Sequence, residues 1–305
     1  MRPRYNRSVP QPLQARLPRV TEDLLRALNE PGEALVPAAL AIAGVEYPAL
    51  DGAPYLQRLE RMAEAAAGRL QRHEGAPAST RIATLNAYLY EELGFSGNRE
   101  HYDDPRNSFL NEVLDRRLGI PISLAVVYLE IGRGAGLRLE GVNFPGHFLV
   151  RALQDPHAAN ANDGLIVDPF HGGAILNEAD CRRLLDRYLG EDAAFEPSLL
   201  AGATRRQVVV RMLLNLKKLY VKMHSFPQAR AATDALLALQ PSSLADLRDR
   251  GLLAYHMNDF SRALRDLEEY LKLARLSEQD EDERKETEQV WEHVKTLRRR
   301  VAQLN

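Results

Sequence analysis

The stretch that decides the fold runs from His101 to Arg151, HYDDPRNSFLNEVLDRRLGIPISLAVVYLEIGRGAGLRLEGVNFPGHFLVR, and resumes at residues 165–173 as LIVDPFHGG. It presents, in chain order, a serine near an expected helix start (Ser123), a histidine in an expected strand (His147) and an aspartate that closes another expected strand (Asp168). A catalytic triad combines a nucleophile, a histidine that acts as the base and an aspartate that orients the histidine. The order is that of a Cys-His-Asp core in which serine holds the cysteine position.

The residues around the three positions suit a catalytic interpretation. Pro121 favours a helix start, which puts Ser123 in a first turn whose unpaired N–H groups and partial positive charge favour an anion. Gly146 precedes His147 and leaves room for a partner close to the imidazole. Asp168 precedes a proline, and a carboxylate there could orient the imidazole. We therefore treat Ser123, His147 and Asp168 as candidate catalytic residues.

Each of the three residues also has a purely structural interpretation. Ser123 could cap its own helix turn by bonding to the backbone. A histidine on an apolar strand is commonly a packed residue with satisfied hydrogen bonds. Asp168 could bond only to backbone N–H groups of the Asp-Pro-Phe-His turn. The sequence leaves both interpretations open for each residue.

Serine in place of cysteine changes the chemistry of the first position. A thiol has a pKa near ~8.5, and a helix terminus together with an imidazolium can ionise it. An alcohol is far harder to ionise, and a helix end contributes only about 1–2 kcal/mol. Ser123 would need proton removal by His147 and a preformed oxyanion hole. The one cysteine, Cys181, follows Asp168 in the chain, and its pattern CRRLLDRY predicts a packed helix residue.

Other polar and aromatic residues are candidates for a binding cleft. Asn107, Ser108 and Asn111 lie within about one helical turn of one another, so they either cap a helix or line a cleft. The residues that we expect in the cleft are Tyr102, Asn107, Asn143, Phe144 and His171.

The histidines and glycines match no cofactor or metal motif. His101, Asp103 and Asp104 do not have the spacing of a defined metal site, and His157 and His171 complete no known pattern. Gly132, Gly134 and Gly136 follow a helix rather than a strand, which is the wrong context for a phosphate loop. We therefore expect no metal and no cofactor.

The segments on either side of this stretch are expected to be helical. Apolar periodicity predicts helices from a cap at Thr21, over 37–43, 55–71 and 79–93, and again from Thr204 onwards. FPQARAATDALLALQ at Phe226 aligns with FSRALRDLEEYLKLA at Phe260, an offset of 34 residues, and this period resembles tetratricopeptide repeats. Two such units are few for a stable array, so we expect them to pack on the core or on the final helix, 278–304. The expected domains are a disordered leader (1–20), a helical subdomain plus core (21–200) and a repeat region (204–305).

Composition excludes several classes of function. The 305 residues are 45% apolar and 27% charged, with a net charge of -2, which gives no electrostatic reason for a nucleic-acid or membrane partner. The first residues are basic and proline-rich without an apolar segment, so they are no secretory signal; an organellar transit peptide is the alternative to a disordered leader. A single cysteine fits a reducing compartment, and we expect a cytoplasmic protein.

The central residues carry a resemblance to a known family. A helix with the nucleophile position, a Gly-His strand and a strand ending in Asp-Pro resemble the transglutaminase-like core. DPRNSFLNEVLDRRLGIPISLAVVYLE (104–130), EGVNFPGHFLVR (140–151) and DPFHGG (168–173) are closer still to the bacterial SirB family. The resemblance covers nearly the whole chain from Thr21. It implies a papain-like α+β core joined to tetratricopeptide repeats, and it carries Ser123, His147 and Asp168 into the triad positions. Members of the SirB family are similar in lacking the transglutaminase cysteine.

These observations support two main hypotheses. The leading one is a non-catalytic, transglutaminase-like scaffold or regulator that binds a peptide or protein through its core cleft or its repeats. The alternative is a Ser-His-Asp amidase, peptidase or transferase, which requires the Ser123 oxygen within about 3.2 Å of an imidazole nitrogen. A third hypothesis makes the core a platform and puts the function in the repeats.

Overall fold

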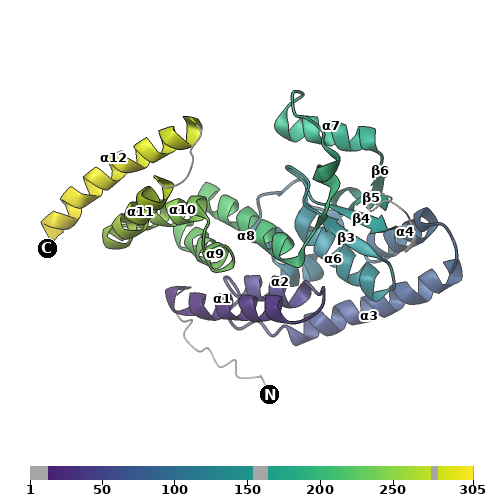
Figure 1. The fold of residues 1–305 in the computed structure, drawn as a ribbon. Helices are drawn as coiled ribbons and strands as arrows, with labels where there is room; N and C mark the ends of the chain where they lie inside the picture. Colours follow the sequence, from purple (N-terminus) through teal and green to yellow (C-terminus); the bar gives the residue numbers. More distant parts are fainter. Residues whose placement is uncertain (1–12, 154–163, 276–280, 305) are drawn as a thin grey trace, which may run out of the picture. The chain divides into compact units, whose positions relative to one another are not determined.

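The computed structural model describes residues 13–153, 164–275 and 281–304 (Figure 1). The chain divides into two compact units. One consists of Arg26–Leu216, and the other joins Met1–Leu25 to Lys217–Asn305. Helices α1 (Leu13–Asn29) and α8 (Arg205–Lys222) contribute residues to both units.

The unit Arg26–Leu216 begins with helices whose apolar faces are buried. In α3, Leu59, Met62 and Leu70 are buried at the helical spacing that the sequence predicts. The next helix, α4, continues as a π-helical segment, Ala87–Glu92, before the chain turns at Gly94. The helices of this unit apart from α1 and α8 are α2 (Val36–Ala43), α3 (Ala53–Leu70), α4 (Ala78–Asn86), α5 (Leu110–Arg116), α6 (Pro121–Gly134) and α7 (Glu178–Leu189).

Helix α6 is the centre of this unit. It starts at Pro121, as predicted, because proline suits the first helical position. Its residues are buried on most sides, as the uncharged run in its middle predicts; Ala125, Val126 and Leu129 have no exposed surface. A Cβ on Gly132 would lie 2.3 Å from Leu139, so glycine is what lets the first strand of the main sheet approach the helix.

The main sheet is antiparallel and has the strand order β6-β5-β4-β3-β7. Val150 pairs with Val167, so the start of β4 lies beside the end of β5. This register brings the residues before β4 close to Asp168, which ends β5. The strands are β3 (Leu139–Val142), β4 (Leu149–Leu153), β5 (Gly164–Asp168), β6 (Ala174–Leu176) and β7 (Gly202–Ala203); a separate parallel pair joins β1 (Ser96–Gly97) to β2 (Leu118–Gly119).

His147 lies just outside the strand that was expected to contain it. The chain turns through Gly146, at φ +68°, and β4 begins only at Leu149. A positive φ interrupts a strand, and glycine is the residue that adopts it without strain. His147 is therefore positioned by a turn rather than by the sheet.

The second unit contains the helical repeat. Helices α9 (Phe226–Leu239), α10 (Leu244–His256), α11 (Phe260–Ala274) and α12 (Glu281–Leu304) follow α8, and α9 and α11 begin 34 residues apart. Ala229 and Ala263 are fully buried at equivalent positions, as small residues at helix contacts should be. An apolar cluster joins α10 and α11 to Val294 and Leu297 of α12. The repeats thus pack on the final helix, one of the two expected solutions.

Two expected boundaries differ from the structure. Helix α1 begins at Leu13, inside the expected leader, and Thr21 lies within it rather than at its cap; Val20 and Leu24 are buried on its apolar face. The division between units falls at Leu216–Lys217, inside α8, and not at 204, because the first part of α8 belongs to the unit Arg26–Leu216. Residues 1–12 of the expected leader, residues 154–163 and the start of the final helix at 278–280 lie outside the described residues. None of the described helices is both long and apolar enough to cross a membrane.

Candidate functional site

Asp168 is fixed by the turn that follows β5. Its Oδ1 accepts hydrogen bonds from the backbone N–H groups of Phe170 (3.0 Å) and His171 (3.3 Å), which makes it the cap of the short helix Pro169–His171. The sequence predicted this backbone bonding as an alternative to a role in the triad. The structure combines the two, because the carboxylate also contacts two imidazoles.

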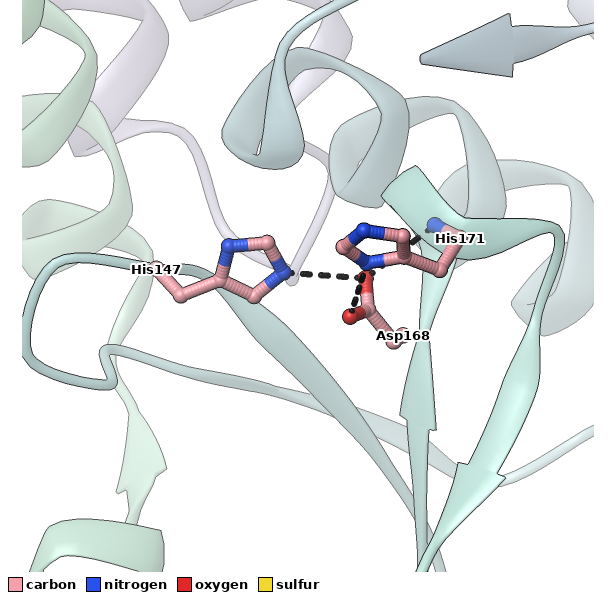
Figure 2. Close-up of side chains that lie close together, drawn as sticks. All are labelled: His147, Asp168 and His171. Atoms are coloured by element: carbon pink, nitrogen blue, oxygen red, sulfur yellow. Dashed lines mark hydrogen bonds and ion pairs between the residues drawn. The ribbon is translucent and has the colours of Figure 1, made fainter. Parts of the chain in front are cut away.

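His147 and His171 lie on either side of the Asp168 carboxylate (Figure 2). His147 Nε2 lies 2.9 Å from Asp168 Oδ1, and His171 Nδ1 lies 2.7 Å from Asp168 Oδ2. His147 and Asp168 are buried, whereas a third of the His171 side chain is exposed. Burial by itself would raise the pKa of Asp168, but its hydrogen bonds and electrostatic interactions with the two histidines outweigh it and lower that pKa. Asp168 is therefore a stable carboxylate between two imidazoles.

The Ser123 hydroxyl is engaged by the backbone. Its oxygen accepts the Ile120 N–H (3.0 Å), and its hydrogen lies within reach of two carbonyl oxygens, that of Asn107 at 2.6 Å and that of Ile120 at 3.1 Å. Among the described residues, every hydrogen bond of this hydroxyl goes to the backbone, and none joins it to His147. The structure thus unites His147 and Asp168 but leaves Ser123 in the capping role that the sequence offered as its alternative.

Tyr188, on α7, covers the other side of His147. The two rings stack with centroids 6.0 Å apart, and the tyrosine oxygen lies 3.5 Å from His147 Nδ1. A Cβ on Gly146 would lie 2.2 Å from the Tyr188 ring, so the close approach anticipated at this glycine is made by tyrosine. Tyr188 was absent from the expected cleft residues, although its spacing from Leu184 and Leu185 in α7 places it on the face of the helix that packs inward.

The expected cleft residues fall into two groups. Tyr102 and Asn143 are exposed. The rings of Tyr102 and Phe170 meet edge to face, with their centroids 5.9 Å apart. Asn143 Oδ1 accepts a hydrogen bond from Arg211 Nη1 at 2.8 Å. Arg211 also donates to the carbonyl oxygen of His147 at 3.3 Å, and burial lowers its pKa. Sequence reasoning missed Arg211 because it lies far along the chain, on α8.

Asn107 and Phe144 do not line a cleft, contrary to expectation. The Asn107 side chain is fully buried and donates to the His101 carbonyl at 2.7 Å, which satisfies it inside the loop before α5. Phe144 is also fully buried, in an apolar cluster between the sheet and α7 that includes Cys181 and Leu185. Both side chains are used to hold the loops around the site and are not available to a ligand.

Cys181 is the packed residue that the sequence predicts. It has no exposed surface, and burial raises the pKa of its thiol to about 11. A thiol in that environment is poorly nucleophilic near neutral pH.

Within the described residues, the group suited to hold a metal ion is His147, Asp168 and His171, whose ligand atoms lie within 4.8 Å of one another.

The site can hold a proton or a cation at its two imidazoles. A buried carboxylate that accepts an imidazole N–H fixes the ring and stabilises its charged form, the orienting role in a triad. Among the described residues, Ser123 is bonded to the backbone and not to the imidazole of His147, whose Nδ1 lies 3.5 Å from the Tyr188 oxygen. The structure therefore pairs His147 with Asp168, as in a triad, and holds Ser123 away from the imidazole.

Comparisons with known proteins match this architecture. The family model described as transglutaminase-like superfamily matches residues 53–214, and a tetratricopeptide repeat model matches residues 216–290. A UPF0162 protein of Xylella fastidiosa (strain Temecula1 / ATCC 700964) is 40% identical over 243 residues, which are 78% of this chain and 83% of that protein. A UPF0162 protein of Vibrio cholerae is 30% identical over 193 residues, 62% of this chain and 69% of that protein. The human F-box only protein 21 is 33% identical over 181 residues, 58% of this chain and 28% of that protein.

The matches coincide with the two parts of the fold. The first model spans the helices and the sheet that carry His147 and Asp168, and the second begins within α8 and ends within α12. The expected fold class, an α+β core of this type followed by an all-helical repeat region, is confirmed. The chain belongs to the transglutaminase-like superfamily.

Proposed function

We propose that this protein is a cytoplasmic, non-catalytic member of the transglutaminase-like superfamily, of the SirB kind, and that it binds a peptide or protein partner. The observation that carries the proposal is the engagement of the Ser123 hydroxyl by the Ile120 N–H and the Asn107 carbonyl. A serine nucleophile needs its proton directed at a base, and here the proton is directed at a backbone oxygen.

The energetics of the site support the proposal that Ser123 does not act as a nucleophile. To reach His147, the Ser123 hydroxyl would have to abandon buried backbone groups, each of which costs about 1–3 kcal/mol when left unsatisfied. His147 itself is held between Asp168 and Tyr188. A reaction at Ser123 would therefore require both partners of the proton transfer to break their present contacts.

The exposed aromatic residues beside the site support binding. Tyr102 and Tyr188 are each nearly half exposed. Burial, with a smaller contribution from the Tyr188 phenol, raises the pKa of Tyr102. Tyrosines with exposed faces and polar ends are typical anchors for peptides, and the neighbouring Asn143 and Arg211 add polar groups. The tetratricopeptide repeats are a second surface of a kind that binds proteins.

The catalytic part of the proposal is tested with a serine-reactive fluorophosphonate. We expect the purified full chain to remain unlabelled while a serine hydrolase in a parallel reaction is labelled to completion. Stoichiometric labelling that Ser123→Ala abolishes would instead establish the Ser-His-Asp hydrolase or transferase. Circular dichroism of the variant separates loss of the nucleophile from loss of the fold.

The binding part is tested with peptides selected on the full chain by display. We expect Tyr102→Ala to weaken the selected peptides by about tenfold or more, the loss associated with removal of an interface anchor. Leu56→Ala, at an exposed apolar residue of α3, is the control and should leave their affinity unchanged. Peptides that bind equally well to the Tyr102 variant but lose affinity on changes in α9–α11 would place the function in the repeats.

A further inference from the structure

We propose that His147, Asp168 and His171 form a binding site for a divalent transition-metal ion of the zinc class. The three side chains come from the turn before β4, the end of β5 and the following short helix, and both imidazoles point at the Asp168 carboxylate (Figure 2). Their ligand atoms lie within 4.8 Å of one another, and two of the three residues are buried. The proposal is independent of Ser123, which is not one of the ligands.

The distances fit ligands around a single ion. Zinc binds imidazole nitrogen and carboxylate oxygen at about 2.0–2.2 Å, so neighbouring ligands in tetrahedral or octahedral sites lie about 3.0–3.5 Å apart. His147 Nε2 is 2.9 Å from one Asp168 oxygen, and His171 Nδ1 is 2.7 Å from the other. Because the two nitrogens now contact different oxygens of Asp168, rotation of the side chains would have to turn both nitrogens towards the ion, which would replace the protons that bridge these atoms.

The chemistry of the three groups selects the class of metal. Two imidazoles and one carboxylate suit zinc, iron, cobalt, nickel or copper, whereas magnesium and calcium prefer oxygen ligands throughout. Three protein ligands leave at least one coordination position for water or for a group of a bound partner. The negative charge of Asp168, which is buried, also favours a cation at this point.

The surroundings of the three residues have the features of an outer shell of a metal site. The backbone N–H of Phe170 holds Asp168 Oδ1 at 3.0 Å, which fixes the carboxylate. With Nε2 of His147 as ligand, its Nδ1–H faces the Tyr188 oxygen at 3.5 Å. Metal-binding histidines usually donate their second ring N–H in this way, which sets the tautomer. The exposed third of the His171 side chain provides a side from which the ion can enter.

The competing interpretation is a hydrogen-bonded His–Asp–His cluster that binds no ion. In that case, each imidazole donates a proton to Asp168, and the same distances result. The two interpretations differ in whether a transition metal binds at these residues, so a titration separates them.

The test is a titration of the full chain with Co²⁺, after removal of any histidine tag and treatment with a chelator. We expect about one equivalent of Co²⁺ to bind with visible ligand-field absorption and to be displaced by Zn²⁺. His171→Ala should weaken binding by at least about 10–100-fold, a loss seen even when an outer-shell partner is removed. His101→Ala, at an exposed histidine that is not one of the three ligands, is the matched control and should bind as the wild type does.

Two results would overturn the metal site. One is the absence of Co²⁺ binding to the wild-type chain, and the other is binding that His171→Ala leaves unchanged while His101→Ala removes it. Asp168→Asn provides a check that does not depend on His171, because it keeps the side-chain size. Zn²⁺ should raise the Tm of the wild type and not that of this variant. Equal increases in Tm for both proteins would contradict the proposal, whatever the fluorophosphonate experiment shows.

Discussion

Ser123 is a buried hydroxyl that joins two segments of the core. It lies three residues after Ile120, the cap of α6, and its oxygen accepts the Ile120 N–H in the manner of a capping box. Its contact with the Asn107 carbonyl attaches the start of α6 to the short helix Pro105–Ser108. At the scale of the residue, its role in stability can therefore be measured separately from catalysis.

We expect Ser123→Ala to lower the free energy of unfolding by about 1–3 kcal/mol, because the Ile120 N–H and the Asn107 carbonyl lose a buried partner. The measurement is urea unfolding followed by circular dichroism. Ser79→Ala, at an exposed serine in α4, should change the same quantity by less than about 0.5 kcal/mol. Equal stability of the wild type and Ser123→Ala would contradict the capping role.

At the scale of the element, Glu130 connects two helices. It lies on α6, is largely buried, and accepts the backbone N–H of Leu35, just before α2, at 2.8 Å. Burial raises the pKa of Glu130 above 4.5, even though the Leu35 bond and the charges of Arg133 and Arg205 lower it. A raised pKa means that the folded protein holds the proton more tightly than the unfolded chain does.

The raised pKa of Glu130 predicts the direction in which stability changes with pH. Between pH 4.5 and the folded pKa, the native state binds more protons, so the contribution of Glu130 to stability falls as the pH rises through that window. We expect Glu130→Gln to be more stable than the wild type at about pH 8 and to lose this advantage as the pH is lowered towards 4.5. Urea unfolding across this range is the measurement, with Glu60→Gln on α3, at an exposed position, as the control. A difference that is constant with pH would contradict the assignment.

The elements that the sequence predicts well are those with strong periodicity or a clear stop. Helix α6 follows from Pro121 and its uncharged run, and α3 from its amphipathic spacing. The strand expected at His147 starts two residues later because the conformation of Gly146 could not be read from its type alone. Cap residues are likewise ambiguous, since Thr21 has a capping side chain but lies inside α1.

At the scale of the whole molecule, the second unit contains a buried ionic contact between its helices. Lys217 on α8 lies 2.7 Å from Asp246 and 2.6 Å from Asp249, both on α10. Lys217 and Asp246 are each less than a tenth exposed. Removing one member of such a group leaves the other charges buried without a partner.

We expect Lys217→Ala to lower the stability of this unit by about 3–5 kcal/mol. The chain's one tryptophan, Trp291, packs against the apolar cluster of α10–α12, so its fluorescence reports on this unit alone. The midpoint of urea unfolding measured by Trp291 fluorescence should fall for Lys217→Ala and remain unchanged for Lys218→Ala, an exposed lysine next to it. A lower midpoint in both variants would indicate a general effect of charge on α8.

The sequence predicts the domain architecture more completely than it predicts the contacts within the candidate site. The 34-residue offset predicts the repeats, and the motifs that resemble the transglutaminase-like core imply the α+β core. The partners of these residues depend on contacts between segments far apart in the chain. The Asn107 carbonyl that binds Ser123 is a backbone atom, which every residue type supplies, so no side-chain pattern could reveal that contact.

The contact between Ser123 and Asn107 also limits how this core could be redesigned. A sulfur atom introduced at position 123 would start beside the same carbonyl, which repels a thiolate, and would be larger than the space that the oxygen fills. An engineer seeking a thiol enzyme on this scaffold would first have to rebuild the turn Pro105–Ser108 so that its backbone no longer faces the nucleophile. A change of this serine to cysteine would therefore have to be accompanied by a movement of the Asn107 carbonyl.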